Sequence, residues 1–456
     1  MINLSPRILW SVPLLFTGFW LAAQDIKLTL SGGANKPVIA LPDFRGTGEA
    51  QALMNAFNAK LYTEIENGVV LSIAPKGMYP LTVPQTPADF KPPRVGPGNR
   101  PISQGPWLTD WSGSPVNSNY LAFGYAAVQN GRLALFGFLY DVTQKDVANA
   151  QVLSKTYFGT LDEAGARDVA VQFAKDILAK FGGTTLAGSR IFFVSDRSGA
   201  KEIWSMDYDG GNQKQVTFYK SVCISPALSL DSSKMAFTKL MPGTPSIQIL
   251  TDTGRRLPFV NRQASMNATP EFTPDGNRVL FSSTLNGSFA NLYIANADGS
   301  NLRRLTNTRA VEVEPKVNPK TGNDVVFISG RGGKAQLYKM SIDGTEVERL
   351  TDGRGEAANP AWHPSGQFVA FAWTAGLEPG NWSIFVMDVT TKNYVQLTTG
   401  ARSENPSWAP GGRHLVFSRT LGRTTQLYSM LADGTGVKQL TFSGNNEKPA
   451  WTKGLP

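Results

Sequence analysis

The chain has 456 residues, of which 41% are hydrophobic and 17% charged, a composition typical of a globular protein of more than one domain. Its net charge of +9 includes no run of five lysines and arginines, which argues against a nucleic-acid groove or a polybasic membrane patch. The single cysteine, Cys223, excludes an intramolecular disulfide and a thiolate metal site of the finger type. We expect no metal, no other cofactor and no nucleic-acid partner.

Residues 1–23 are predicted to be a secretory signal peptide. Arg7 supplies the positive charge, and an apolar stretch follows it from Ile8 to Ala22. Small residues stand before the polar Gln24, which predicts cleavage after Ala23. A retained anchor is the alternative, but the stretch is short for a membrane span and is interrupted by a proline and a glycine. We expect export across the inner membrane and no membrane span after cleavage.

Residues 24–182 predict a small α/β domain. Val38 to Leu41 and Val69 to Ala74 have the pattern of strands, and Glu49 to Asn58 that of a helix. The segment from Pro80 to Pro106 contains eight prolines, which predicts a loop without regular structure.

The second half of this domain predicts a hairpin and a helix. Tyr120 to Gln129 and Arg132 to Asp141 flank an Asn-Gly pair, the strongest short signal for a two-residue turn. Thr160 and Glu163 are expected to form a capping box at the start of the helix. Gly182-Gly183 ends it. The apolar face of this helix consists of Ala166, Val169, Ala170, Phe173, Ile177 and Phe181.

A repeat dominates residues 183–456. Proline opens each copy, and successive prolines are separated by 43 to 46 residues. Each copy predicts four strands: one at the proline, one after a Pro-x-Gly turn, one at a Leu-Tyr or Ile-Phe pair, and one that follows an Asp-Gly turn and ends in Leu-Thr. Four antiparallel strands in about 45 residues describe one blade of a β-propeller. The opening prolines are Pro226, Pro270, Pro315, Pro360, Pro406 and Pro449.

The two ends of the array predict how the ring closes. The first copy begins at Ser189 without an opening strand, and the last fragment, Lys448 to Thr452, is an opening strand alone. Joined, they make one blade and remove the free edges. The predicted fold class is therefore mainly β: a six-bladed propeller preceded by a small α/β domain.

Polar residues stand just before the repeat prolines, in loops that open on one face of a propeller. We expect them to form a ring there: Asn267, Glu314, Asn359, Glu404, Asn405 and Glu447. The alternative is that such side chains only satisfy backbone groups at strand ends. The blade aromatics are expected in the core: Phe272, Phe281, Trp362, Trp408 and Trp451.

Catalytic interpretations have little support. The chain contains no GxSxG, GxGxxG or P-loop motif, and both histidines fall in blade turns or strands. A propeller lyase or glycosidase that uses Glu314, Glu356 and Glu404 is the main alternative. A sugar-binding propeller is a second one, but the ring loops contain no aromatic residue.

The whole pattern resembles one family, the TolB proteins of the Tol–Pal envelope system. The resemblance rests on the signal segment, the α/β domain, the sequence LFGFLYDVTQKD from Leu135 to Asp146, and blades of the form PxWxPDGxxxxFxS…LYxxxxDGxxxxxLT. Two positions depart from it. Family members often have an Ala-His pair where this chain has Val169-Ala170, and often a histidine where it has Met266.

This resemblance implies a monomeric, non-enzymatic protein of the periplasm that supports outer-membrane integrity and envelope constriction at division, and that takes part in protein import. It implies binding of the lipoprotein Pal by the propeller and of TolA by the N-terminal segment, with other outer-membrane lipoproteins or porins as further partners. Besides the polar ring, the expected Pal positions are Met266, Asn267, Ala268, Thr269, Val313 and Glu314. The expected TolA positions are Gln24, Asp25, Ile26, Lys27 and Leu28.

Overall fold

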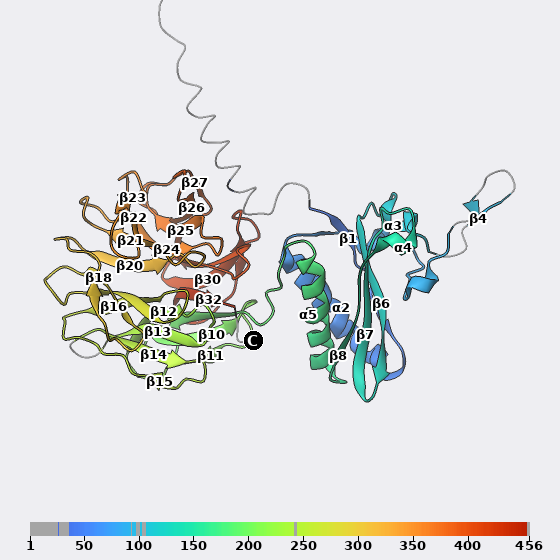
Figure 1. Ribbon diagram of the computed structural model, residues 1–456, viewed down its shortest axis with the longest axis horizontal. Coiled ribbons are helices and arrows are strands. Elements are labelled where there is room, and N and C mark those ends of the chain that lie inside the picture. Colours follow the sequence, from blue (N-terminus) through green and yellow to red (C-terminus); the bar gives the residue numbers. More distant parts are fainter. Residues whose placement is uncertain are drawn as a thin grey trace, which may run out of the picture. The chain divides into compact units, whose positions relative to one another are not determined.

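The computed structural model describes Ile26 and residues 36–92, 94–96, 101–102, 106–240 and 244–453 (Figure 1). The predicted signal peptide and its cleavage site lie outside these residues. Within the described ranges, no helix is both long enough and apolar enough to cross a membrane. The chain divides into two compact units with the boundary between Ala187 and Gly188.

The N-terminal unit is built on a mixed sheet in the order β3-β1-β6-β7-β8, with β2 also paired to β6. β1 pairs parallel with β3 and β6, whereas β6, β7 and β8 are antiparallel. The predicted hairpin of β6 and β7 is confirmed, because Asn130 and Gly131 have the positive φ values, 50° and 71°, of a two-residue turn. The strands are β1 (Val38–Ala40), β2 (Arg45–Gly46), β3 (Ser72–Ile73), β6 (Tyr120–Gln129), β7 (Arg132–Asp141) and β8 (Gln151–Gly159).

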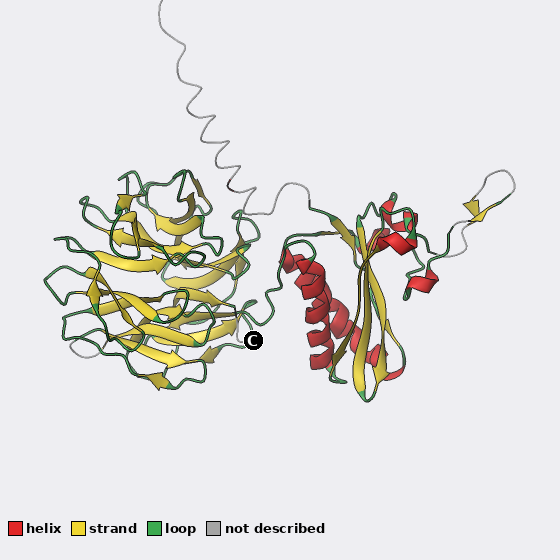
Figure 2. Cartoon of the chain, viewed as in Figure 1, coloured by secondary structure: helices red, strands yellow, loops and turns green. Residues whose placement is uncertain are grey.

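Two helices, α2 (Met54–Gly68) and α5 (Glu163–Ala179), cover one face of this sheet (Figure 2). Their apolar sides supply the buried Phe57, Leu61 and Phe173 of the main core. Gly137 of β7 leaves room for Phe173, since a Cβ there would lie 2.8 Å from the phenylalanine ring. Burial of this face stabilises the unit by the usual hydrophobic term, about 25 cal/mol per Å² of apolar surface.

The proline-rich segment contributes to a second core that includes Phe90, Trp111, Phe123 and Tyr140. The rings of Phe90 and Tyr140 stack at 5.7 Å. Around these anchors the described residues of the segment and its flanks form short elements. They are η2 (Lys76–Met78), η3 (Pro87–Asp89), β4 (Arg94–Val95), β5 (Pro101–Ile102) and α3 (Thr109–Ser112), and α4 (Val147–Ala150) follows β7.

Several predicted boundaries are wrong. The first helical stretch begins as a 3-10 helix, η1 (Gly48–Leu53), and α2 continues ten residues beyond the predicted end at Asn58. Val69 then takes a left-handed φ of 60° as the C-cap of α2, so the strand predicted from Val69 to Ala74 is reduced to β3. The strand β8 was not predicted, because its side chains alternate weakly and only Tyr157 and Gly159 are buried.

The capping box predicted from Thr160 and Glu163 is also wrong. Asp162 is the N-cap of α5, and its carboxylate accepts a hydrogen bond from the Gly165 amide at 2.7 Å. The Thr160 hydroxyl instead donates to Asp162 at 2.7 Å. Asp and Thr are both favoured at the N-cap, so the sequence alone does not decide whether Thr160 or Asp162 caps α5.

The C-terminal unit is a propeller of six four-stranded antiparallel sheets, as predicted (Figure 1). Blade 1 contains β32 (Asn446–Thr452), β9 (Arg190–Ser195), β10 (Glu202–Asp207) and β11 (Lys214–Gln215). Blade 2 contains β12 (Val222–Leu228), β13 (Lys234–Leu240), β14 (Ser246–Thr251) and β15 (Arg256–Leu257). Blade 3 contains β16 (Asn267–Phe272), β17 (Arg278–Ser283), β18 (Asn291–Asn296) and β19 (Arg303–Arg304).

The other three blades repeat this pattern. Blade 4 contains β20 (Glu312–Val317), β21 (Asp324–Ser329), β22 (Gln336–Ser341) and β23 (Glu348–Arg349). Blade 5 contains β24 (Ala357–Trp362), β25 (Phe368–Trp373), β26 (Ser383–Asp388) and β27 (Tyr394–Gln396). Blade 6 contains β28 (Arg402–Trp408), β29 (His414–Leu421), β30 (Thr424–Leu431) and β31 (Lys438–Gln439).

The predicted closure of the ring is confirmed. β32, from the end of the chain, pairs antiparallel with β9 and completes blade 1. Trp451 of β32 also donates its indole N–H to the Ser189 hydroxyl at 3.0 Å. Because β32 is the innermost strand of blade 1, the first and last copies of the repeat are joined by main-chain hydrogen bonds.

Glycine in the Asp-Gly turns allows neighbouring blades to approach closely. Gly344 has a φ of 92°, and a Cβ there would lie 2.4 Å from the carbonyl oxygen of Leu305 in the preceding blade. A Cβ at Gly299 would likewise come too close to the backbone of Val260 in the preceding blade. The turn therefore needs glycine for its backbone conformation and for the contact between blades.

We predict that Gly344→Ala lowers the free energy of unfolding by roughly 1 kcal/mol or more beyond the loss caused by Gly333→Ala. Gly333 is a matched control, since it also has a positive φ, 98°, but has open space around its Cβ position. Urea unfolding of both variants measures the difference. Equal losses would contradict the role of glycine in the contact between blades.

Candidate functional site

Each blade has a β-bulge in its innermost strand at the repeat proline. The pairing register with the next strand shifts there in all six blades. Proline has no N–H to donate, so a bulge on an edge strand is where a sheet accepts it. The residue before each proline has a left-handed φ between 50° and 57° and lines the central channel. We call these six residues the mouth ring: Ser225, Thr269, Glu314, Asn359, Asn405 and Lys448.

Hydrogen bonds link four successive members of the mouth ring, from Thr269 to Asn405. The Glu314 amide donates to the Thr269 hydroxyl at 3.3 Å. The Asn359 amide and side chain donate to the two carboxylate oxygens of Glu314 at 2.7 and 3.0 Å. The Asn405 amide donates to the Asn359 side-chain oxygen at 3.4 Å. The side chains of Thr269, Glu314 and Asn359 thus each accept a hydrogen bond from a backbone N–H that the bulge of the next blade leaves unpaired.

The structure places the predicted ring residues in three different settings. Glu314, Asn359 and Asn405 belong to the mouth ring, whereas Asn267 is buried and accepts a hydrogen bond from the Ser283 hydroxyl at 2.8 Å. Glu404 and Glu447 stand one residue earlier than the ring.

These two carboxylates have partners of their own. Glu404 pairs with Arg402, and Glu447 with Lys201 at 2.6 Å. The expectation that the six predicted residues are equivalent is therefore wrong.

The remaining predicted positions surround the ring. Thr269 is a member of it, Met266 and Val313 are half-buried beside it, and Ala268 is buried. Sequence reasoning missed Ser225 and Lys448 as members. The signal that identifies them is their position directly before the repeat proline, because that residue carries the bulge in every blade.

The three carboxylates that a propeller lyase or glycosidase would use do not come together in the channel. Of Glu314, Glu356 and Glu404, only Glu314 lines the cavity, and both of its oxygens already accept hydrogen bonds from Asn359. Within the described ranges no cluster of three histidine, cysteine, aspartate or glutamate side chains could hold a metal ion. This arrangement does not provide the paired carboxylates of a glycosidase.

Neither histidine is placed as a catalytic base. Burial lowers the pKa of His363 and of His414 to about 4, so both imidazoles are neutral at pH 7. His363 bonds the Ser365 hydroxyl at 2.7 Å and the Gly412 carbonyl at 3.0 Å. The hydrogen bond to Gly412 joins the turns of two neighbouring blades.

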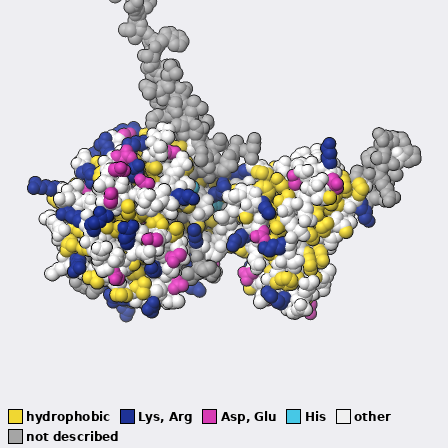
Figure 3. Space-filling view, viewed as in Figure 1, with side chains coloured by type: hydrophobic (Ala, Val, Ile, Leu, Met, Phe, Trp, Pro, Cys, Tyr) yellow, Lys and Arg dark blue, Asp and Glu magenta, His cyan; other side chains and the backbone are white. Residues whose placement is uncertain are grey.

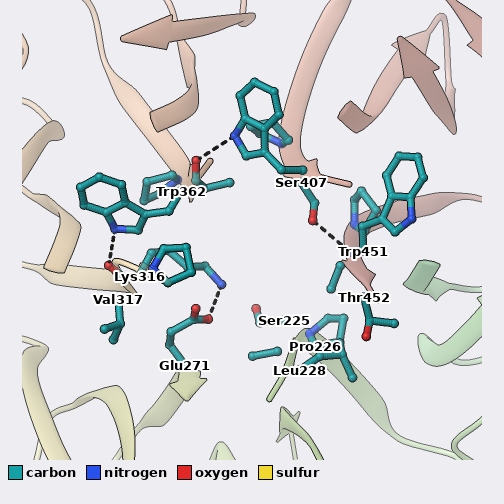
Figure 4. Close-up of a pocket in the computed structure, with 18 of the residues that line it drawn as sticks. Ser225, Pro226, Leu228, Glu271, Lys316, Val317, Trp362, Ser407, Trp451 and Thr452 are labelled. Carbon is teal, nitrogen blue, oxygen red and sulfur yellow. Dashed lines mark hydrogen bonds and ion pairs between the residues drawn. The ribbon is translucent and has the colours of Figure 1, made fainter. Parts of the chain in front are cut away.

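Behind the mouth ring lies a cavity of about 270 Å³ (Figure 4). Six repeat prolines line it, together with the edges of Trp362, Trp408 and Trp451. The predicted core position of the blade aromatics is confirmed, since all five are less than one-tenth exposed. The three tryptophans nevertheless also form the channel wall.

Charge is mixed over the face of the propeller seen in Figure 3. In the view of Figure 3, lysines and arginines are interspersed with aspartates and glutamates. The face in view therefore has no groove lined by a single sign of charge, the feature expected of a nucleic-acid site.

Fold and site together define a closed six-bladed propeller with a polar ring at one end of its channel and a small α/β unit before it. A family model described as the TolB beta propeller domain matches residues 175–455. The chain belongs to this TolB family.

Individual relatives agree with this assignment. The chain is 33% identical over 217 residues to the "Protein TolB homolog" of Chlorobium luteolum, which covers 47% of this chain and 48% of that one. It is 29% identical over 192 residues to the "Tol-Pal system protein TolB" of Desulfosudis oleivorans, covering 42% of each. The chain thus spans about half the length of the curated relatives it matches.

A solved structure, TolB from Acinetobacter baumannii, has the same fold as this chain. It superposes with a TM-score of 0.72 over 92% of this chain and 97% of its own, at 21% sequence identity. The likeness extends beyond the propeller and includes the N-terminal unit.

We predict that Glu314→Ala lowers the free energy of unfolding by about 1–3 kcal/mol, because it leaves the half-buried amide of Asn359 without an acceptor. Glu356→Ala is the control: it removes an exposed carboxylate from the corresponding loop of the next blade and should change stability by less than about 0.5 kcal/mol. Denaturant unfolding measures both. If the two variants lose the same stability, the ring hydrogen bonds do not stabilise the propeller.

Proposed function

We propose that this chain is a non-catalytic interaction protein of a Tol–Pal system in the periplasm. The observation that carries the proposal is its membership of the TolB family, together with a relative named as a Tol-Pal system protein. The carboxylates of Glu314, in the mouth ring, and of Glu404, beside it, already have hydrogen-bond or ion-pair partners, which favours binding over catalysis. Such a protein would support outer-membrane integrity and envelope constriction at division.

The proposed surface for Pal is the mouth-ring face of the propeller. Loops that join successive blades reach this face, and its half-buried polar groups are held by hydrogen bonds from blade to blade. A surface fixed in this way loses little conformational entropy on binding. The proposed contact positions are Met266, Asn267, Ala268, Thr269, Val313, Glu314, Asn359, Glu404, Asn405 and Glu447.

The proposed site for TolA is the N-terminal segment from Gln24 to Leu28. Of its five residues, only Ile26 lies within the described part of the chain. Ile26 is 6% exposed and belongs to the hydrophobic cluster of blades 5 and 6, with Trp408 and Phe417. If Ile26 exchanges between this cluster and TolA, binding of Pal and of TolA would be coupled.

We predict that the purified mature chain binds the soluble domain of Pal from the same organism, and that Thr269→Arg weakens this binding at least about tenfold. The arginine would put a long cation into the mouth ring. Asn277→Arg, in an exposed blade turn outside the ring loops, is the matched control and should leave the affinity unchanged. Isothermal titration calorimetry measures both variants. No binding by the folded chain would contradict the proposal and favour a different ligand for the propeller.

We predict that deletion of residues 24–35 abolishes binding to TolA but not to Pal. The conservative variant Ile26→Val tests the anchor without removing the segment and should keep both partners. Calorimetric titration with each partner separates the two effects. Undiminished TolA binding after the deletion would place the TolA site elsewhere.

A further inference from the structure

One ion pair faces the channel behind the mouth ring. The six residues directly after the repeat prolines all line the cavity, and the two charged ones among them are Glu271 and Lys316. The Lys316 ammonium lies 2.7 Å from a Glu271 carboxylate oxygen, and their side chains are 31% and 19% exposed. Figure 4 shows both side chains pointing into the cavity. The other charged residues of the lining are Glu314, Lys448 and Lys453.

The tryptophans in the wall around this pair are apolar surfaces that hydrogen bonds hold in place. Trp362 donates its indole N–H to the Lys316 carbonyl at 2.9 Å, and Trp408 donates to the Ala361 carbonyl at 3.2 Å. Each bond joins neighbouring blades, so the tryptophan edges cannot move independently of the ring. The cavity of about 270 Å³ is slightly smaller than typical drug-sized sites of about 300–1,000 Å³ and would hold only a small molecule.

The polar groups in the cavity have unused hydrogen-bonding capacity. An ammonium has three donors, and the one hydrogen bond of the Lys316 ammonium within the described chain is to Glu271. The Ser407 hydroxyl, which points into the cavity from another blade in Figure 4, accepts from the Trp451 amide at 3.0 Å and keeps its proton for a further acceptor. Burial raises the pKa of the Glu271 carboxyl, and the charge of Lys316 opposes this rise.

We propose that this cavity binds a free α-amino acid with an apolar side chain. Its carboxylate would accept hydrogen bonds from Lys316 and Ser407, its ammonium would donate to Glu271, and its side chain would contact the tryptophan edges. The site goes beyond the proposed partner binding and does not depend on it.

Charge selects a zwitterion over a simple ion. A carboxylate alone would be attracted to Lys316 but would lie beside the Glu271 carboxylate, and an amine alone would meet the opposite conflict. A zwitterion places an opposite charge beside each member of the pair, so neither half-buried group loses its partner. This complementarity disfavours ligands of either single charge relative to a zwitterion.

The test titrates the purified mature chain, without Pal or TolA, with L-leucine, followed by calorimetry and by ligand-observed NMR. Two partial ligands accompany it: 4-methylpentanoate, which lacks the amine, and 3-methylbutylamine, which lacks the carboxylate. We expect saturable binding of leucine, and at least about tenfold weaker binding of each partial ligand.

Variants assign the binding to the cavity. Lys316→Met and Glu271→Gln should each weaken leucine binding at least about tenfold, whereas the exposed Lys320→Met should not change it. If either pair variant fails to fold, Ser407→Ala provides the same test from the opposite wall. The absence of leucine binding, equal binding of 4-methylpentanoate, or binding that none of these cavity variants weakens would overturn the proposal. Because no partner is present, failure here would leave the Pal proposal untouched.

Discussion

The pairing of β32 with β9 is the constraint on which the rest of the propeller depends. It joins the last strand of the chain to the first blade, so that every blade has two neighbours and every innermost strand faces the channel. A ring closed by main-chain hydrogen bonds fixes the angle between successive blades. The repeat prolines set the position of the six bulges, and the closed ring brings the residues before them together as the mouth ring.

The mouth ring has two roles that are difficult to separate. The side chains of Thr269, Glu314 and Asn359 accept hydrogen bonds from the amides of the next bulge, which is the stabilising role expected of polar groups at strand ends. The same groups remain half-buried at the end of the channel, where a partner can reach them. A variant that weakens binding can therefore act by disturbing the ring, and substitutions such as Thr269→Arg need their stability measured alongside.

Features that are repeated along the chain or determined by a short local motif could be predicted from the sequence. Features that depend on the pairing register between strands could not. The proline period identified six blades and their closure, and the Asn-Gly pair placed the β6–β7 hairpin to the residue. The positions of Asn267 and Glu404 were misjudged because a bulge changes which side of the strand a residue faces, and the spacing of prolines does not show where the register shifts. The ion pair of Glu271 and Lys316 joins blades 3 and 4, so it forms only when these two neighbouring blades pack against each other.

Hydrogen–deuterium exchange of the mature chain, with and without the soluble domain of Pal, tests the central claim most directly. Slowed exchange should appear in the loops that carry the mouth ring, around residues 221–225, 266–269, 311–314, 356–359, 402–405 and 445–448. The blade turns that contain Gly276, Gly366 and Gly412 should exchange at the same rate in both states. Protection of those turns or of the N-terminal unit, with unchanged exchange in the mouth loops, would contradict the account.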